Sequence, residues 1–367
     1  MRFAAGGNVT VTTPSSGIGL IVEGGGASIT GTVLTPSQPM FRATRATSDQ
    51  TSGAVLIYNS DSVSGNWEAD AGSNYNTSTG EVVVKHENHT PTGSFKARGG
   101  VVYVDSLRHA GSLPKGLVTA TRGNHGQSVA IAASRLGLRA VIVVPEGNSI
   151  EKNAAMVAFG GELVIAGKDF DESRVIAAQI QRERGYHFVP AFHRELVKGV
   201  ATYAYELFTS YPDLDIVYVP IGMGSGICGL ITIRDLLGLK TEIVGVVAAN
   251  APAFALSLEA GRITPTETAR TFADGMACRE PQPEPFEIIR RGAARIVTVT
   301  EDEIAEAVRV LFTDTHNAAE GAGAAPLAAL LHEKERYQGK RAGVILSGGN
   351  IDMPVFAQIL RGQTPAI

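Results

Sequence analysis

The stretch GLVTATRGNHGQSVAIAASRLGLRAVIVVPEG, residues 116–147, decides the fold. An apolar run at 116–120 is followed by an amphipathic run at 127–138 and by a second apolar run at 139–144. Apolar runs without polar alternation are typical of strands that are buried on both faces, and a helix that joins two such strands makes them parallel. The stretch therefore predicts a strand–helix–strand unit in a parallel sheet that helices cover on both sides.

The same alternation continues from residue 82 onward, with further apolar runs in DIVYVPIG, TEIVGVVAA and AGVILSGGN. A capping box is expected at Thr300 and Glu303, because a threonine followed three residues later by a glutamate marks a helix start. Before residue 82 the chain contains no lysine and shows short alternating runs, which predict strands separated by turns. The expected fold class is α/β and doubly wound, preceded by a β-rich segment.

The composition excludes several classes of function. The 367 residues carry a net charge of −4, and no run approaches the roughly 18 apolar residues that a membrane helix needs. The chain has no blocks of Lys and Arg for nucleic acid and no start typical of a signal peptide, so we expect a cytoplasmic protein. Cys228 and Cys278 lack disulfide or metal-ligand spacing, and we expect buried thiols and no metal.

Ligands bind at the C-terminal ends of the strands in such a sheet, so the loops after the apolar runs are the candidates for a site. The loop VPIGMGSGICG enters a predicted helix through small residues, whose backbone N–H groups can converge on an anion. We interpret it as a phosphate site, with a tight strand-to-helix turn as the alternative. Its small residues are Gly222, Gly224, Ser225, Gly226 and Gly229.

Three further stretches place polar side chains near the same edge. TATRGNHGQSVA carries Asn124 and His125 between glycines, with an Asn-Gly turn as the alternative. VILSGGNID ends a predicted strand with Ser347, which taken alone favours a capping serine. In HENHTPTGSFKARGG a single lysine, Lys96, lies among glycines that we expect to let the backbone approach a ligand. Together these groups are what a pyridoxal phosphate site requires, whereas a solvated Lys96 leaves the glycines unexplained.

In this order, the motifs resemble those of the fold-type-II pyridoxal phosphate enzymes, specifically the threonine/serine dehydratase group. The resemblance covers residues 82–360 and includes KHENHTPTGSFKARGG, TRGNHGQSVA, VPIGMGSGICG, SLEAGR, ADGMA, EGAGAAPLAAL and SGGN. It implies that Lys96 carries the cofactor and serves as general base, that Phe95 packs beside the ring, and that Asn124 contacts its 3′ oxygen. Ser347 would meet the pyridine nitrogen, where a neutral group favours β-elimination. The phosphate would be held by Gly222, Gly224, Ser225 and Gly226.

The implied reaction is β-elimination of a hydroxy amino acid such as L-threonine or L-serine, which gives a 2-oxo acid and ammonia. Arg122 stands where the family's common SSGNH motif has a serine. Two interpretations of Arg122 are therefore open. Either its guanidinium recognises the second carboxylate of a 3-hydroxyaspartate, or its side chain points outward. A β-replacement synthase of the same fold is a further alternative. The substrate would be bound by Thr121, Arg122, Gly123 and His125.

We also expect a homodimer that acts on a small amino acid. No structural cation is expected from the resemblance, because Val247 stands where many members have a metal-binding glutamate.

The N-terminal part departs from this resemblance. Residues 38–82 resemble the opening strands of a C1q-like jelly roll, so we expect a partial C1q-like β segment at 1–81. The catalytic part would comprise a large subdomain at 82–117 and 196–367 and a small subdomain at 118–195. If the C1q-like part decided the function, the chain would be an adhesion or trimerisation module with an inactive passenger.

Overall fold

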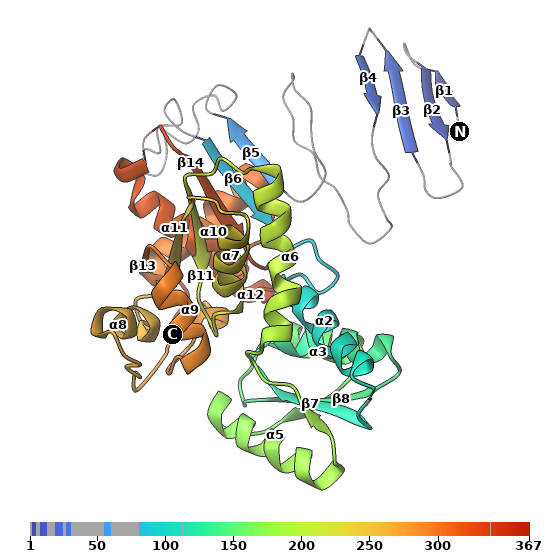
Figure 1. Ribbon diagram of the computed structural model, residues 1–367, viewed down its shortest axis with the longest axis vertical. Coiled ribbons are helices and arrows are strands. Elements are labelled where there is room, and N and C mark those ends of the chain that lie inside the picture. The colour runs from blue at the N-terminus through green and yellow to red at the C-terminus, as the bar shows by residue number, and fades with distance from the viewer. Residues whose placement is uncertain are drawn as a thin grey trace.

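The computed structural model describes most of the chain (Figure 1). Most of residues 38–82, for which the C1q-like jelly roll is expected, lies outside the described residues. The described residues are 2–4, 8–12, 19–24, 27–30, 55–59, 81–111, 113–337 and 339–367, with side chains from residue 82 onward.

The larger sheet has six strands in the order β13-β12-β11-β14-β6-β5, and every neighbouring pair is parallel except β5 with β6. This parallel arrangement confirms the α/β class that the apolar runs predict. The strands are β5 (Val55–Asn59), β6 (Glu81–His86), β11 (Ile216–Pro220), β12 (Glu242–Ala248), β13 (Arg295–Val299) and β14 (Arg341–Leu346).

The smaller sheet has four parallel strands in the order β10-β7-β8-β9, and it lies below the larger sheet in Figure 1. Its centre is the predicted strand–helix–strand unit, in which helix α3 (Asn124–Arg135) joins β7 to β8. The strands are β7 (Gly116–Ala120), β8 (Arg139–Val144), β9 (Gly161–Ile165) and β10 (His187–Phe188). Neither β9 nor β10 is evident as an apolar run, because both keep partly exposed side chains.

Helices cover both faces of the larger sheet. Successive residues of β6 face opposite cores, since Val82 and Val84 belong to one buried cluster and Val83 to the other. The first cluster is closed by α10 (Glu301–Thr315), α11 (Gly321–His332) and α12 (Met353–Leu360). The second cluster is closed by α6 (Arg194–Ser210), α7 (Ser225–Leu236), α8 (Ala253–Ala260) and α9 (Pro283–Gly292).

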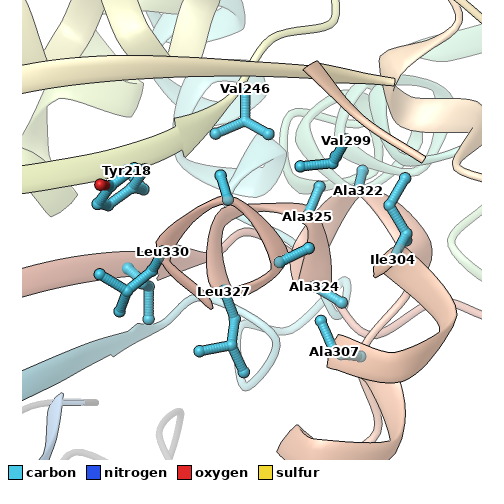
Figure 2. Packing of buried hydrophobic residues seen from close by; sticks show 14 of the residues in the cluster. Tyr218, Val246, Val299, Ile304, Ala307, Ala322, Ala324, Ala325, Leu327 and Leu330 are labelled. Carbon is cyan, nitrogen blue, oxygen red and sulfur yellow. The ribbon is translucent and has the colours of Figure 1, made fainter. Parts of the chain in front are cut away.

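Helix α11 lies directly against the sheet. In Figure 2 the Ala325 side chain of α11 lies below the strands, and Val246 of β12 and Tyr218 of β11 lie above the helix. Small side chains on α11 let it approach the strands closely, because a bulkier residue would separate the two layers. The capping box predicted at the start of α10 is confirmed, since Thr300 and Glu303 exchange side-chain-to-backbone hydrogen bonds.

Three further α-helices and two short 3-10 helices complete the described part of the chain. They are α2 (Lys96–His109), α4 (Ile150–Ala158) and α5 (Phe170–Arg184), together with the short 3-10 helices η2 (Asp274–Met276) and η3 (Lys334–Tyr337).

Two kinds of strand occur in the N-terminal part. Four strands form a separate antiparallel sheet in the order β1-β2-β3-β4. By contrast, β5 lies within the segment 1–81 yet pairs with β6, with Tyr58 opposite Val82. The strands of the separate sheet are β1 (Arg2–Ala4), β2 (Asn8–Thr12), β3 (Gly19–Gly24) and β4 (Ala27–Thr30).

Candidate active site

A cavity of about 930 Å³, part of it open to solvent, lies at the C-terminal ends of β7, β11 and β14. Parallel strands bring the loops that follow them to one edge, which is why segments far apart in the sequence meet here. The structure brings all the predicted site residues together in the lining of this cavity. They are Phe95, Lys96, Thr121, Arg122, Gly123, Asn124, His125, Gly222, Gly224, Ser225, Gly226 and Ser347.

Lys96 is the first residue of α2, and its amine lies inside the cavity. Its Nζ donates a hydrogen bond to Ser225 Oγ at 2.9 Å and lies 4.9 Å from the centre of the Phe95 ring. Burial lowers the pKa of Lys96 from 10.5 to about 8, while the nearby Glu320 acts in the opposite direction. An amine with this pKa is partly neutral near pH 7, so it can act as a nucleophile or a base.

The glycines that follow Lys96 have another role than the one expected from sequence. A Cβ atom on Gly99 would lie 2.9 Å from the carbonyl oxygen of Leu196 in α6. A Cβ atom on Gly100 would lie 2.6 Å from the carbonyl oxygen of Ser128 in α3. Both glycines therefore let α2 pack closely on its neighbouring helices, and neither lines the cavity.

The loop before α7 forms an anion cradle. Its N-cap residue Gly224 has φ +93°, a conformation that favours glycine, and a Cβ on Gly222 would lie 2.1 Å from the carbonyl oxygen of Gly275. The N–H groups of Ser225 and Gly226 begin the helix and have no hydrogen-bond acceptor among the described residues. Free N–H groups at a helix N-terminus attract an anion.

Gly226 differs from the other glycines of the cradle. A Cβ atom there would meet Tyr203 Oη at 3.5 Å, Phe95 Cζ at 3.6 Å and Val219 Cγ2 at 3.7 Å, which are ordinary contacts. The protein itself therefore does not require glycine at this position. Gly226 and its neighbour Phe95 both line the cavity.

Asn124 and Ser347 both line the cavity. The Asn124 amide donates to Glu320 Oε1 at 2.6 Å and accepts from Asn350 Nδ2 at 2.8 Å, which fixes its orientation. Ser347 directly follows β14 and is buried, and its hydroxyl has no partner within the described part of the chain.

The start of α3 offers a second group of donors. Thr121 Oγ1 accepts hydrogen bonds from the N–H groups of Gly123 at 3.0 Å and Gly126 at 3.3 Å, which shapes the loop. Burial, with the charge of Lys96, lowers the pKa of His125 to about 3, so its ring is neutral. His125 Nε2 is buried and, over residues 82–367 as described, has no hydrogen-bond partner.

Three charged residues in the cavity carried no predicted role. Lys152 Nζ, on α4, lies 2.7 Å from Asp274 Oδ2 and 3.1 Å from Glu320 Oε2. Burial lowers the pKa of Lys152, but the two carboxylates outweigh it and hold the pKa above its ordinary value. Burial raises the pKa of Glu320, against the effect of Lys152. Asp274 and Glu320 lie in the quoted motifs ADGMA and EGAGAAPLAAL, whereas nothing in the sequence distinguishes Lys152 from a surface lysine.

Arg122 lines the cavity and is exposed. Lys152 forms ion pairs, whereas the Arg122 guanidinium forms none with any residue that the structure describes.

The cavity fits pyridoxal phosphate, whose aldehyde and phosphate need an amine and an anion cradle. The Lys96 amine has a lowered pKa, and among the described residues the N–H groups of Ser225 and Gly226 and the Ser347 hydroxyl have no hydrogen-bond partner. Gly226 lines the cavity at a position where packing of the protein does not require glycine. Together the fold and the cavity define a pyridoxal phosphate enzyme with parallel α/β sheets.

Comparison with known proteins agrees with this class. The family described as pyridoxal-phosphate dependent enzyme matches residues 69–348, and the chain belongs to it. The match begins within the segment 1–81, ahead of the boundary expected at residue 82.

Individual relatives are similar over most of the chain. The L-threonine ammonia-lyase of Geobacter sulfurreducens is 38% identical over 287 residues, which cover 78% of this chain and 71% of that protein. The catabolic L-threonine dehydratase of Escherichia coli is 35% identical over 283 residues, covering 76% of this chain and 86% of that protein. The structure of threonine deaminase isoform 2 from Solanum lycopersicum matches with a TM-score of 0.72 and 30% identity, over 76% of this chain and 82% of that chain.

These findings fix the cofactor as pyridoxal phosphate. In the described part of the chain, no helix has the length and apolar character needed to cross a membrane.

Proposed function

We propose that the chain is an ammonia-lyase that converts L-threonine or L-serine to a 2-oxo acid and ammonia. The observation that carries this proposal is the Lys96 amine, whose pKa is lowered by burial and which lies beside the anion cradle of α7. The relatives named L-threonine ammonia-lyase and L-threonine dehydratase support the choice of substrate.

Each predicted residue has a role in this reaction. Bound pyridoxal phosphate stabilises negative charge at the Cα atom of an amino acid joined to it. Lys96 binds the cofactor and removes the Cα proton, because its amine is partly neutral near pH 7. Asn124 would contact the cofactor's 3′ oxygen, and Ser347 would meet the pyridine nitrogen. Phe95 would pack against the ring, and the phosphate would be held by Gly222, Gly224, Ser225 and Gly226.

The substrate carboxylate binds at the start of α3. The N–H groups of Asn124 and His125 have no acceptor among the described residues, and they point from a helix N-terminus that lines the cavity. The substrate-binding residues are Thr121, Arg122, Gly123 and His125.

A second candidate substrate is a 3-hydroxyaspartate. Arg122 is the cavity residue that favours it, because a guanidinium without an ion pair among the described residues is available for a second carboxylate.

We also infer four further features of the chain. The chain acts as a homodimer in the cytoplasm. It has a large subdomain at 82–117 and 196–367 and a small subdomain at 118–195. The two separate sheets support this division, although β7 of the smaller sheet begins at Gly116, two residues before the boundary. Residues 38–82 are C1q-like, an inference that rests on their sequence pattern alone.

The proposal is tested by supplying the purified chain with pyridoxal phosphate and measuring 2-oxo acid formation from L-threonine and L-serine. We expect turnover of at least one of them, and the loss of turnover in the Lys96→Ala variant. A loaded chain that releases no 2-oxo acid from either amino acid or from 3-hydroxyaspartate would refute the proposed activity.

A further inference from the structure

The Ser225 hydroxyl bonds to the Lys96 amine, and Ser225 is itself a residue of the anion cradle. Ser225 is the first residue of α7 and is only 2% exposed. Its Oγ accepts the hydrogen bond from Lys96 Nζ at 2.9 Å. Among the described residues no acceptor takes the hydroxyl's own proton, so that proton is free to point elsewhere.

An anion bound in the cradle can accept the hydrogen bond from the Ser225 hydroxyl. The N–H groups of Ser225 and Gly226 have no acceptor among the described residues, and an anion that they bind can also accept a hydrogen bond from the Ser225 hydroxyl. Ser225 can then accept from Lys96 and donate to the anion at the same time, because a hydroxyl has one donor and two acceptor sites.

We propose that Ser225 is a catalytic residue that relays a proton from Lys96 Nζ to the anion held at the N-terminus of α7. This inference rests on the proposed lyase activity. Lys96 becomes an ammonium when it takes the Cα proton of the substrate. One N–H proton then passes to Ser225 Oγ while the Ser225 O–H proton passes to an oxygen of the anion.

The relay balances in protons and bonds. Ser225 ends with one proton, as it began, and Lys96 returns to its neutral form. The anion in the cradle gains one proton, and this proton is consumed when the β-hydroxyl leaves as water. No oxidant or reductant takes part.

Other titratable groups near Lys96 do not compete for this role. Glu320 faces it from the start of α11 and raises its pKa, but its oxygens bond to Asn124 and pair with Lys152. His125 on α3 is neutral, with a pKa of about 3. Tyr203 on α6 donates to the Gly226 carbonyl at 2.9 Å, and burial holds its pKa well above the ordinary value.

The first arm of the test uses the cofactor-free chain with inorganic phosphate as probe. The pKa of Lys96 is measured from the pH dependence of its acylation, read by mass spectrometry, with and without phosphate. In Ser225→Ala we expect the pKa to fall, because the charged amine loses its acceptor, and phosphate binding to weaken about 2- to 10-fold through one lost hydrogen bond. Ser225→Thr, which keeps the hydroxyl, should restore both.

The second arm uses the loaded enzyme. Ser225→Ala should lower kcat for L-threonine about 100-fold with little change in KM, and Ser225→Thr should recover most of it. The control is Thr232→Ala, which deletes a hydroxyl from the same helix at an exposed position where it donates to the Cys228 carbonyl. We expect the control to match the wild-type chain in both arms.

Two results would overturn the relay. Weaker phosphate binding with an unchanged Lys96 titration would make Ser225 a phosphate contact only. Unchanged kcat in Ser225→Ala would remove it from the reaction. A wild-type chain that titrates and binds phosphate as expected but turns over no amino acid would instead refute the proposed activity and leave the Lys96–Ser225 contact standing.

Discussion

Replacing Lys152 by methionine should destabilise the fold in a manner that depends on pH. Lys152 Nζ is the cation between Asp274 and Glu320, at 2.7 and 3.1 Å, and the Lys152 and Glu320 side chains are only 5% and 4% exposed. Breaking a buried ion pair costs about 3–5 kcal/mol when the remaining charge stays buried. Asp274 is 28% exposed and can be hydrated, so most of the cost falls on Glu320.

Protonation of Glu320 limits that cost. Burial already raises its pKa and Lys152 opposes the effect, so the pKa rises further in the variant. Protonating a carboxyl of ordinary pKa 4.5 at pH 7 spans 2.5 pH units at about 1.36 kcal/mol each, an upper limit of about 3.4 kcal/mol. At pH 5 the same limit is about 0.7 kcal/mol. The loss of stability is therefore present above the unfolded pKa of Glu320 and fades as the pH falls towards it.

The assay is urea unfolding of the cofactor-free chain at pH 7 and pH 5. Lys152→Met/Glu320→Gln should recover much of the stability at pH 7, since Gln is neutral and its amide oxygen can still accept from Asn124. Lys168→Met is the matched control, because Lys168 forms an exposed i,i+4 pair with Glu172, and it should be neutral at both pH values. Equal destabilisation by Lys152→Met at pH 5 and pH 7 would refute the role given to the Glu320 charge.

Four further predictions concern the cavity. Lys96→Ala should leave the melting temperature unchanged but prevent covalent retention of pyridoxal phosphate after borohydride reduction, and retained label would contradict the assignment. The rate of cofactor attachment to the wild-type chain should rise with pH through about 8, because the neutral amine is the nucleophile, whereas a midpoint near 10.5 would mean that burial does not act. Arg122→Ala should lower the kcat/KM ratio for 3-hydroxyaspartate over L-threonine about 10- to 100-fold, and equal effects on both substrates would show an outward-pointing side chain. Gly226→Ala should fold normally yet bind the cofactor weakly, while Gly224→Ala should lose stability because of its φ of +93°, as circular dichroism and dialysis against cofactor can measure.

Much of the fold and the site's location follows from local sequence signals. The apolar runs of β7 and β8 and the helix between them are recognisable because buried parallel strands lack polar alternation. The loops after β7, β11 and β14 can then be assigned to one edge without coordinates, since parallel strands end on the same side. Lys96 is distinguished by the motif around it, so its place in the cavity is also predictable.

The tertiary structure alone decides which groups interact across that edge. Lys152 has no local signal, and it becomes part of the site because α4 brings it to Asp274 and Glu320, more than a hundred residues away in the chain. Gly99 and Gly100 serve helix packing, which depends on where α3 and α6 lie. The pKa of Lys96 and its hydrogen bond to Ser225 depend on burial and on a partner 129 positions away. Such properties are sums over long-range neighbours, so they are fixed only when the chain has folded.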